Sequence, residues 1–217
     1  MPAPRLILAS ASPWRAKLLT DVGVHVELFP APIDEEAIIA DDPVALAVAR
    51  AAAKAEAVAA RISSVLQPPA SSLAAVILGA DQVAHLDGEA FGKPRDPDDH
   101  RRRLRLLRGR THTLSTAVAF RGPAGVLLGL SASPADFVEH THIRFRCDVT
   151  DDEIDAYVKS GDGSGCAGGY RAEGPGAWLI AGVDGDWTNV IGLPVFGVLH
   201  RLRRLGFPWG ASSPGTS

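Results

Sequence analysis

The stretch Leu6-Ile7-Leu8-Ala9-Ser10-Ala11-Ser12-Pro13-Trp14-Arg15 determines how the first part of this chain folds. Its apolar residues 6–9 predict a short buried strand. Ser12 as N-cap, with Pro13 in the first helical position, predicts a helix immediately afterwards. That helix is expected to end at Gly23, since glycine is the usual residue just past a helix C-terminus.

The same turn is a candidate anion site. It carries the hydroxyls of Ser10 and Ser12, the guanidinium of Arg15 and the indole of Trp14. A strand–loop–helix start presents unpaired backbone N–H groups and the positive end of a helix dipole, which together favour phosphate. An ordinary capped helix has the same sequence pattern, so the rest of the chain must decide between the two interpretations.

Outside this stretch, predicted strands and helices alternate along the chain. Asp87-Gly88 and Gly122-Pro123 each predict a hairpin between flanking strands. This pattern indicates an α/β fold with a mixed sheet covered by helices. We expect one domain over residues 1–207, with two lobes around a cleft, and a disordered tail over 208–217. Strands are predicted at 24–29, 75–79, 82–86, 89–92, 111–121, 126–130, 137–146 and 177–183, and helices at 42–62, 96–108, 150–159 and 193–205.

Composition and charge exclude several classes of protein. The 217 residues are 46% hydrophobic and 22% charged, with a net charge of −3, which gives no bulk attraction for nucleic acid or anionic membranes. No apolar run is long enough to span a membrane. The N-terminal apolar run is too short for a signal peptide, and Cys147 and Cys166 are too few for a disulfide framework, so a cytoplasmic location is expected.

Four charged residues outside the opening stretch are candidates for chemistry. Asp81 is expected at the carboxyl end of the most apolar strand, where α/β proteins bind ligands, although a turn-capping Asp fits equally well. Glu35, next to Asp34, offers carboxylate oxygen to a divalent cation, but acidic surface loops are common. Lys54 and Lys93 lie in an Ala-rich helix and a turn, where lysines are usually solvated.

Other motifs give weaker signals. The segment 161–165 is Gly-rich, but it follows a helix rather than a strand, so a flexible lid or turn is expected instead of a phosphate loop. His140 and His142 share one face of a predicted strand, but no third zinc ligand is evident. There is no Gly-x-Ser-x-Gly motif to suggest a serine hydrolase.

Taken together, the motifs resemble the Maf family of nucleoside triphosphate pyrophosphatases, once described as septum-formation inhibitors. The resemblance implies an α/β fold on a long twisted mixed sheet, similar to that of inosine triphosphate pyrophosphatases, and it allows a homodimer. It covers nearly the whole chain, from Leu6 to about Gly206. The motifs that carry it are Leu-Ala-Ser-Ala-Ser-Pro-Trp-Arg (8–15), Ile-Asp-Glu (33–35), Lys54, Gly-Ala-Asp-Gln-Val (79–83), Gly-Lys-Pro (92–94), Cys-Ala-Gly (166–168) and Gly-Leu-Pro (192–194).

Three positions suggest a branch of the family. Members acting on dTTP and UTP usually have Arg, Thr and Gln where this chain has Trp14, Gln82 and Glu173. The combination here looks like the branch that hydrolyses 7-methyl-GTP to 7-methyl-GMP and pyrophosphate. An indole face attracts the delocalised charge of 7-methylguanine by ~0.5–2 kcal/mol. The carboxylate of Glu173 could accept hydrogen bonds from the N1–H and amine of guanine, while Gln82 would adjust the fit.

The resemblance also implies a mechanism, the hydrolysis of the α–β phosphoanhydride with a divalent cation, Mg²⁺ or Mn²⁺. Asp81 would be the proton acceptor, or equally a metal ligand, and Glu35 a second ligand or a water-orienting residue. Charge on the phosphates would be stabilised by Lys54, Lys93 and Arg15, and the phosphate oxygens would be bound by Ser10, Ser12 and the helix N-terminus.

Two other functions remain open from the sequence. The first is the same chemistry on dTTP or UTP. The second is a non-catalytic inhibitor of cell division that acts through partner proteins, although charged residues converging at the ends of elements favour an enzyme. A nucleic-acid-binding module fits least well with the acidic balance.

Overall fold

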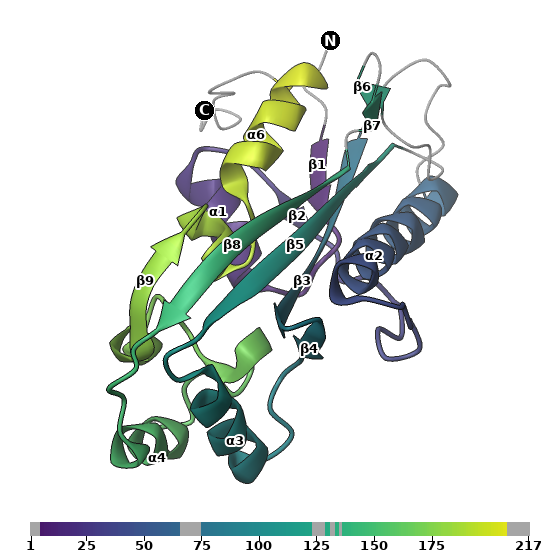
Figure 1. The fold of residues 1–217 in the computed structure, drawn as a ribbon. Coiled ribbons are helices and arrows are strands. Elements are labelled where there is room, and N and C mark those ends of the chain that lie inside the picture. The colour runs from purple at the N-terminus through teal and green to yellow at the C-terminus, as the bar shows by residue number, and fades with distance from the viewer. Residues whose placement is uncertain (1–4, 66–74, 123–128, 131–132, 135, 208–217) are drawn as a thin grey trace.

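The structure is a computed structural model that describes residues 5–65, 75–122, 129–130, 133–134 and 136–207. A mixed seven-stranded sheet forms its centre, with helices on both faces and at one end (Figure 1). The strands are β1 (Arg5–Leu8), β2 (Glu27–Leu28), β3 (Ala75–Leu86), β4 (Glu89–Phe91), β5 (Thr111–Arg121), β8 (Phe137–Phe145) and β9 (Ile180–Asp184), and a separate small ribbon pairs β6 (Gly129–Leu130) with β7 (Ser133–Pro134). The helices are α1 (Pro13–Asp21), α2 (Pro43–Val65), α3 (Pro97–Leu107), α4 (Asp151–Lys159), α5 (Trp187–Ile191) and α6 (Val195–Arg204), and two short 3-10 helices are η2 (Ala167–Gly169) and η3 (Pro175–Leu179).

The long strand β3 organises the sheet. The order is β2-β1-β3-β5-β8-β9, with β1 parallel to both β2 and β3 and the other pairs antiparallel. On one edge of β3, β1 pairs with Ala75–Leu78 and β4 pairs with Ala84–Leu86. No described strand pairs with residues 79–83 on that edge. Between β1 and β4, a short stretch of β3 therefore has one edge without a partner strand.

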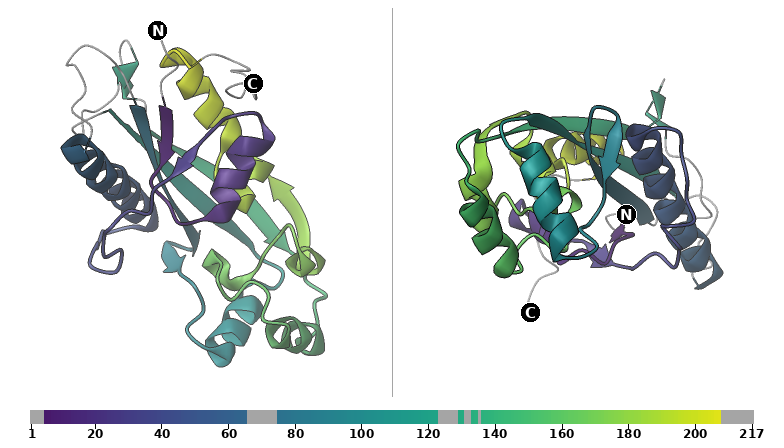
Figure 2. Two further views of the ribbon diagram at one scale, coloured as in Figure 1. Left: turned by 180° about the vertical axis from the view of Figure 1, so that it is seen from behind. Right: turned by 60° about the horizontal axis from the view of Figure 1, so that its bottom comes forward.

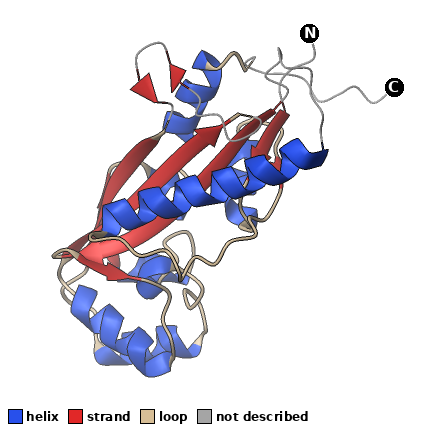
Figure 3. Cartoon of the chain, turned by 90° about the vertical axis from the view of Figure 1, so that its right-hand side faces the viewer, coloured by secondary structure: helices blue, strands red, loops and turns tan. Residues whose placement is uncertain are grey.

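Different helices cover the two faces of the sheet at the end that is uppermost in Figure 1. The single long helix α2 lies along one face, whereas α1 and α6 pack on the other (Figures 2 and 3). Beyond α2, the lower ends of β3, β5 and β8 pack with α3 and α4 into a further apolar cluster, which includes Leu104, Leu107, Ile143 and Ile154. Among the described helices, none is long and apolar enough to cross a membrane.

The packing of α2 on β3 is unusually close because both surfaces are made of small residues. Ala47, Ala51, Ala55 and Ala59 repeat every four residues along α2 and are 0–1% exposed. They face Gly79 on β3, where an added Cβ would lie only 2.2 Å from the carbonyl oxygen of Ala51. This close approach brings the α2 backbone next to the unpaired stretch of β3.

Most of the local signals in the sequence are confirmed. Ser12, Asp96 and Thr150 each cap a helix with their side chains, and Thr150 forms a full capping box with Glu153. The predicted hairpin at Asp87-Gly88 is present, with φ of 53° and 83° at its two turn residues, as a type I′ turn requires. The α/β class and the mixed sheet flanked by helices are likewise as expected.

Three predictions about elements are wrong. Asp81 is not at the end of a strand, because β3 continues from residue 75 to 86 without a break. The predicted strand 177–183 starts as η3 and becomes a strand only at Ile180, and the predicted strand 24–29 is reduced to Glu27–Leu28. In each case, pairing partners distant in sequence decide where the strand begins and ends.

Two further predictions lie wholly or mostly outside the described residues: the disordered tail at 208–217, and the hairpin at Gly122-Pro123 with its strand at 126–130. Thr111–Arg121, the first strand of that hairpin, pairs with β3 and β8. The segment 161–165 forms turns after α4, and a Cβ at Gly163 would lie 2.6 Å from both the Tyr157 hydroxyl and the Gly169 carbonyl oxygen.

We expect Gly79→Ala to destabilise the protein by about 2–3 kcal/mol, because the new methyl group has no space against the backbone of α2. Urea denaturation measures this change in the free energy of unfolding. Gly92→Ala is the matched control, since nothing lies within 4 Å of its added Cβ. Equal stability of the two variants would contradict the close packing of α2 on β3.

Candidate functional site

A buried ion pair joins α2 to the unpaired stretch of β3. Lys54 Nζ lies 2.7 Å from Asp81 Oδ1, and both side chains are only 8% exposed. Lys54 is on the same helix face as the alanines that pack on β3, and Asp81 is two residues after Gly79, on the same face of the strand. The second carboxylate oxygen of Asp81, Oδ2, is buried and has no hydrogen-bond partner among the described residues.

Glu35 completes this cluster from the loop before α2. Its Oε2 lies 2.9 Å from Lys54 Nζ, and its side chain is 48% exposed. Partial burial acts to raise the pKa of the Glu35 carboxyl, but the hydrogen bond and charge of Lys54, helped by Arg50 and Arg15, lower it overall. Arg50 also donates to the Glu35 carbonyl oxygen at 3.0 Å, which ties the loop to α2. Lys54 therefore holds two carboxylates, one buried and one facing solvent.

Arg15 approaches the same place from α1. Its Nε donates to the Gly192 carbonyl at 2.8 Å, and its Nη1 donates to the Ala80 carbonyl at 3.0 Å on the unpaired edge of β3. Burial lowers the pKa of the Arg15 guanidinium, while the charges of Asp81 and Glu35 oppose that shift. Arg15 stays protonated at neutral pH, so its charge lies beside the carboxylate cluster.

The two serines of the opening stretch lie at the start of α1. The Ser12 hydroxyl caps the helix by accepting from the Arg15 backbone N–H at 3.4 Å, a long contact. The Ser10 hydroxyl oxygen accepts from the Ser12 backbone N–H at 3.1 Å and from Arg15 Nη1 at 3.4 Å. Because Ser10 accepts in both bonds, its own hydroxyl hydrogen is available as a donor.

Gln82 is next to Asp81 in sequence but lies on the opposite face of β3. Its Nε2 donates to Thr116 Oγ1 at 2.9 Å and to the Asn189 carbonyl at 2.6 Å. Asn189 is fully buried on α5, and its Nδ2 donates to Thr141 Oγ1 at 3.0 Å. Sequence reasoning missed α5, although Asp186 before it and Gly192 after it are ordinary start and stop signals.

Trp14 and Glu173 are brought together by a third residue, Arg171. The Trp14 side chain is on α1 and the residue is 44% exposed. The guanidinium carbon of Arg171 lies 5.8 Å from the centre of the Trp14 ring, and Arg171 Nε lies 3.9 Å from Glu173 Oε1. No local signal in the sequence marks Arg171, because its contact is with a residue of another element.

Lys93 is exposed at the end of the β4 hairpin, close enough to Cys166 to affect its ionisation. Burial raises the pKa of the Cys166 thiol, with the charges of Glu173 and Asp162 adding to the rise and those of Arg171 and Lys93 opposing it. Lys93 therefore acts on the same thiol as Arg171 and Glu173.

The carboxylates fit a divalent cation of the Mg²⁺ type. Such ions take one or two carboxylates and complete their shell with water and substrate phosphates. Asp81 Oδ2 is a buried oxygen without a partner, and Glu35 offers a second carboxylate beside it. In the part of the chain that the structure describes, no cluster of three or more His, Cys, Asp or Glu side chains forms a metal site from protein ligands alone.

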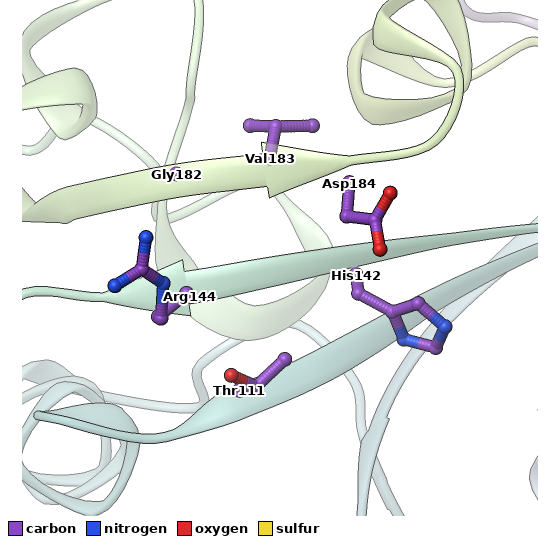
Figure 4. A pocket seen from close by; sticks show the side chains of 6 residues that line it. All are labelled: Thr111, His142, Arg144, Gly182, Val183 and Asp184. Carbon is purple, nitrogen blue, oxygen red and sulfur yellow. The ribbon is translucent and has the colours of Figure 1, made fainter.

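Two other features lie apart from this site. His140 and His142 accept or donate hydrogen bonds to Ser115 and Thr113 on β5, at 2.8 and 3.0 Å. A pocket of about 370 Å³ lies across β5, β8 and β9, and none of the expected site residues lines it (Figure 4). Its lining consists of Thr111, His142, Arg144, Gly182, Val183 and Asp184.

Comparison with known proteins identifies the family. The family model for Maf-like protein matches residues 5–205. The chain belongs to the Maf-like protein family. A dTTP/UTP pyrophosphatase from Moorella thermoacetica is 39% identical over 211 residues, which cover 95% of this chain and 98% of the relative. A nucleoside triphosphate pyrophosphatase from Streptomyces coelicolor is 41% identical, covering 94% of this chain and 90% of the relative.

A further Maf relative, a dTTP/UTP pyrophosphatase from Anaeromyxobacter dehalogenans, is 38% identical over 206 residues, covering 95% of this chain and 96% of the relative. The family and these names agree on a hydrolase, a nucleoside triphosphate pyrophosphatase. The substrates in the names fit the dTTP/UTP alternative better than the expected 7-methyl-GTP.

We expect Lys54→Met to destabilise the protein by about 3–5 kcal/mol, because it leaves the buried Asp81 carboxylate without its cation. The double variant Lys54→Met with Asp81→Asn should be more stable than Lys54→Met alone, since the stranded charge is gone. Urea denaturation of the two single variants and the double variant measures the coupling. Additive effects of the two substitutions would contradict a buried ion pair.

Proposed function

We propose that this Maf protein hydrolyses the α–β phosphoanhydride of nucleoside triphosphates, with dTTP and UTP as its substrates, to give the monophosphate and pyrophosphate. The observation that carries the proposal is the buried Lys54–Asp81 pair, whose unpartnered carboxylate oxygen lies on the unpaired stretch of β3. The choice of substrate rests on the relatives named dTTP/UTP pyrophosphatase.

The triphosphate would bind across the start of α1. The hydroxyls of Ser10 and Ser12 and the helix N-terminus would hold phosphate oxygens. Arg15, whose charge lies beside the carboxylate cluster, would offset the negative charge of the phosphates together with Lys54. Lys93 would approach from the exposed hairpin end on the opposite side.

Asp81 would act as the general base. Its Oδ2 accepts a proton from a water molecule, the water oxygen attacks the α-phosphorus, and the bond from that phosphorus to the bridging oxygen breaks to release pyrophosphate. Lys54 holds the carboxylate by its other oxygen and orients Oδ2 towards the water. With Asp81 as the base, Mg²⁺ or Mn²⁺ would be held by Glu35 and the phosphates, and it would supply positive charge to the triphosphate and lower the pKa of bound water.

The second candidate substrate is 7-methyl-GTP, favoured by the side chains at three positions. Trp14, Gln82 and Glu173 differ from the Arg, Thr and Gln usual in family members that act on dTTP and UTP. Trp14 presents an exposed indole, and Glu173 lies near it through Arg171. An indole face and a carboxylate both suit a positively charged purine.

Asp81→Asn is expected to reduce kcat by about 10²–10⁴-fold, the usual contribution of a general base, while nucleotide binding is retained. Pyrophosphate release measures the rate, and calorimetric titration with a nucleotide measures binding. Asp98→Asn is the matched control, because its side chain is 95% exposed on α3. Near-wild-type turnover of Asp81→Asn would exclude Asp81 as the base.

Substrate choice is tested by pyrophosphate release from dTTP, UTP, CTP, GTP and 7-methyl-GTP, each with Mg²⁺ or Mn²⁺. We expect the highest kcat/KM for dTTP and UTP. A higher value for 7-methyl-GTP would favour the second candidate, and Glu173→Gln should then lower that value selectively. Release from none of the five nucleotides would overturn the proposed function.

A further inference from the structure

Arg171 occupies the surface that a nucleobase would need if Trp14 and Glu173 read it. Its guanidinium lies over the Trp14 indole, and its Nε is within 3.9 Å of Glu173. The chain therefore already places a planar cation where the sequence suggested that a cationic purine would bind. Trp14 is on α1 and Arg171 follows η2, so the contact joins two distant segments.

The position of Arg171 is built by its surroundings. Asp162 Oδ1 forms an ion pair with Arg171 Nη2 at 2.9 Å, and Asp162 Oδ2 accepts a hydrogen bond from the Tyr157 hydroxyl at 2.7 Å. The same Tyr157 oxygen accepts from the Arg171 backbone N–H at 3.0 Å. A Cβ at Gly174 would lie 2.6 Å from Arg171 Nη2, so that position must lack a side chain for the guanidinium to fit. Arg171 is thus held at both its backbone and its head group.

The charge of Arg171 has opposite consequences for the two classes of base. A positively charged 7-methylguanine would meet a like charge at the indole face and would find Glu173 beside another cation. A neutral pyrimidine carries carbonyl oxygens that accept hydrogen bonds. The Arg171 side chain is 33% exposed and its guanidinium carries five N–H donors, so it can donate to such an oxygen.

We propose that Arg171 is a specificity-determining residue that favours a neutral base and disfavours a cationic one, by covering the indole of Trp14 and facing the carboxylate of Glu173. This inference rests on the proposed pyrophosphatase function and adds to it the residue that sets the charge of the accepted base.

The test is the ratio of kcat/KM for 7-methyl-GTP to that for UTP. Arg171→Met removes the charge and keeps an unbranched side chain. The ratio should then rise by about tenfold, which is the size expected when the cationic base takes over the cation–π contact that Arg171 makes with Trp14. The matched control is Arg144→Met, in the pocket of Figure 4, which should leave the ratio unchanged. A loss of folding or of general activity would lower kcat/KM for both substrates together and would not raise their ratio. A ratio within twofold of the wild-type value would overturn the proposal.

A second measurement needs no variant. Inhibition of wild-type UTP hydrolysis by 7-methyl-GMP and by GMP compares a cationic with a neutral base on the same ring system. We expect 7-methyl-GMP to bind no more tightly than GMP, and tighter binding of 7-methyl-GMP by about tenfold would refute the role of Arg171. If the wild-type protein releases pyrophosphate but the ratio does not respond, only this inference fails. If it releases none, the proposed function fails first.

Discussion

The contact on which the site depends is the ion pair between Lys54 and Asp81 at the interface of α2 and β3. It forms because Gly79 and the alanine stripe of α2 let the helix backbone approach the strand closely. A buried carboxylate needs a cation, and a buried lysine needs an anion, so each residue requires the other. The same pair leaves one oxygen of Asp81 without a partner, which is the group available for chemistry.

The sheet supplies the space for that chemistry. β3 is longer than either strand on its β1 edge, so residues between β1 and β4 stay unpaired on that side. Arg15 donates to one of the free carbonyls there and to the carbonyl of Gly192, directly after α5, while Gln82 donates to Asn189 on α5. Antiparallel pairing with β5 satisfies the other edge of this stretch. A ligand site at a gap in a sheet can thus be both open and well supported.

Charge also organises the side of the site that faces the base. Burial raises the pKa of the Cys166 thiol, the charges of Glu173 and Asp162 add to the rise, and those of Arg171 and Lys93 oppose it. The indole of Trp14 is covered by a cation from the chain itself. Trp14 therefore cannot be interpreted alone, because a cation of the chain itself already lies 5.8 Å from the centre of its ring.

The sequence by itself determined the caps, the hairpin at Asp87-Gly88 and the α/β class, since these depend on local chemistry, and its motifs marked Glu35, Lys54 and Asp81, which the structure brings together. Only the tertiary structure decided that Asp81 lies within a strand, that Gln82 points away from it, and that Arg171 lies between Trp14 and Glu173. The strand continues through Asp81 because β5 pairs with β3 both before and after that position, from Ile77 to His85. Arg15 binds a carbonyl 177 positions away. Contacts of this kind arise from packing between distant segments, which local propensity does not encode.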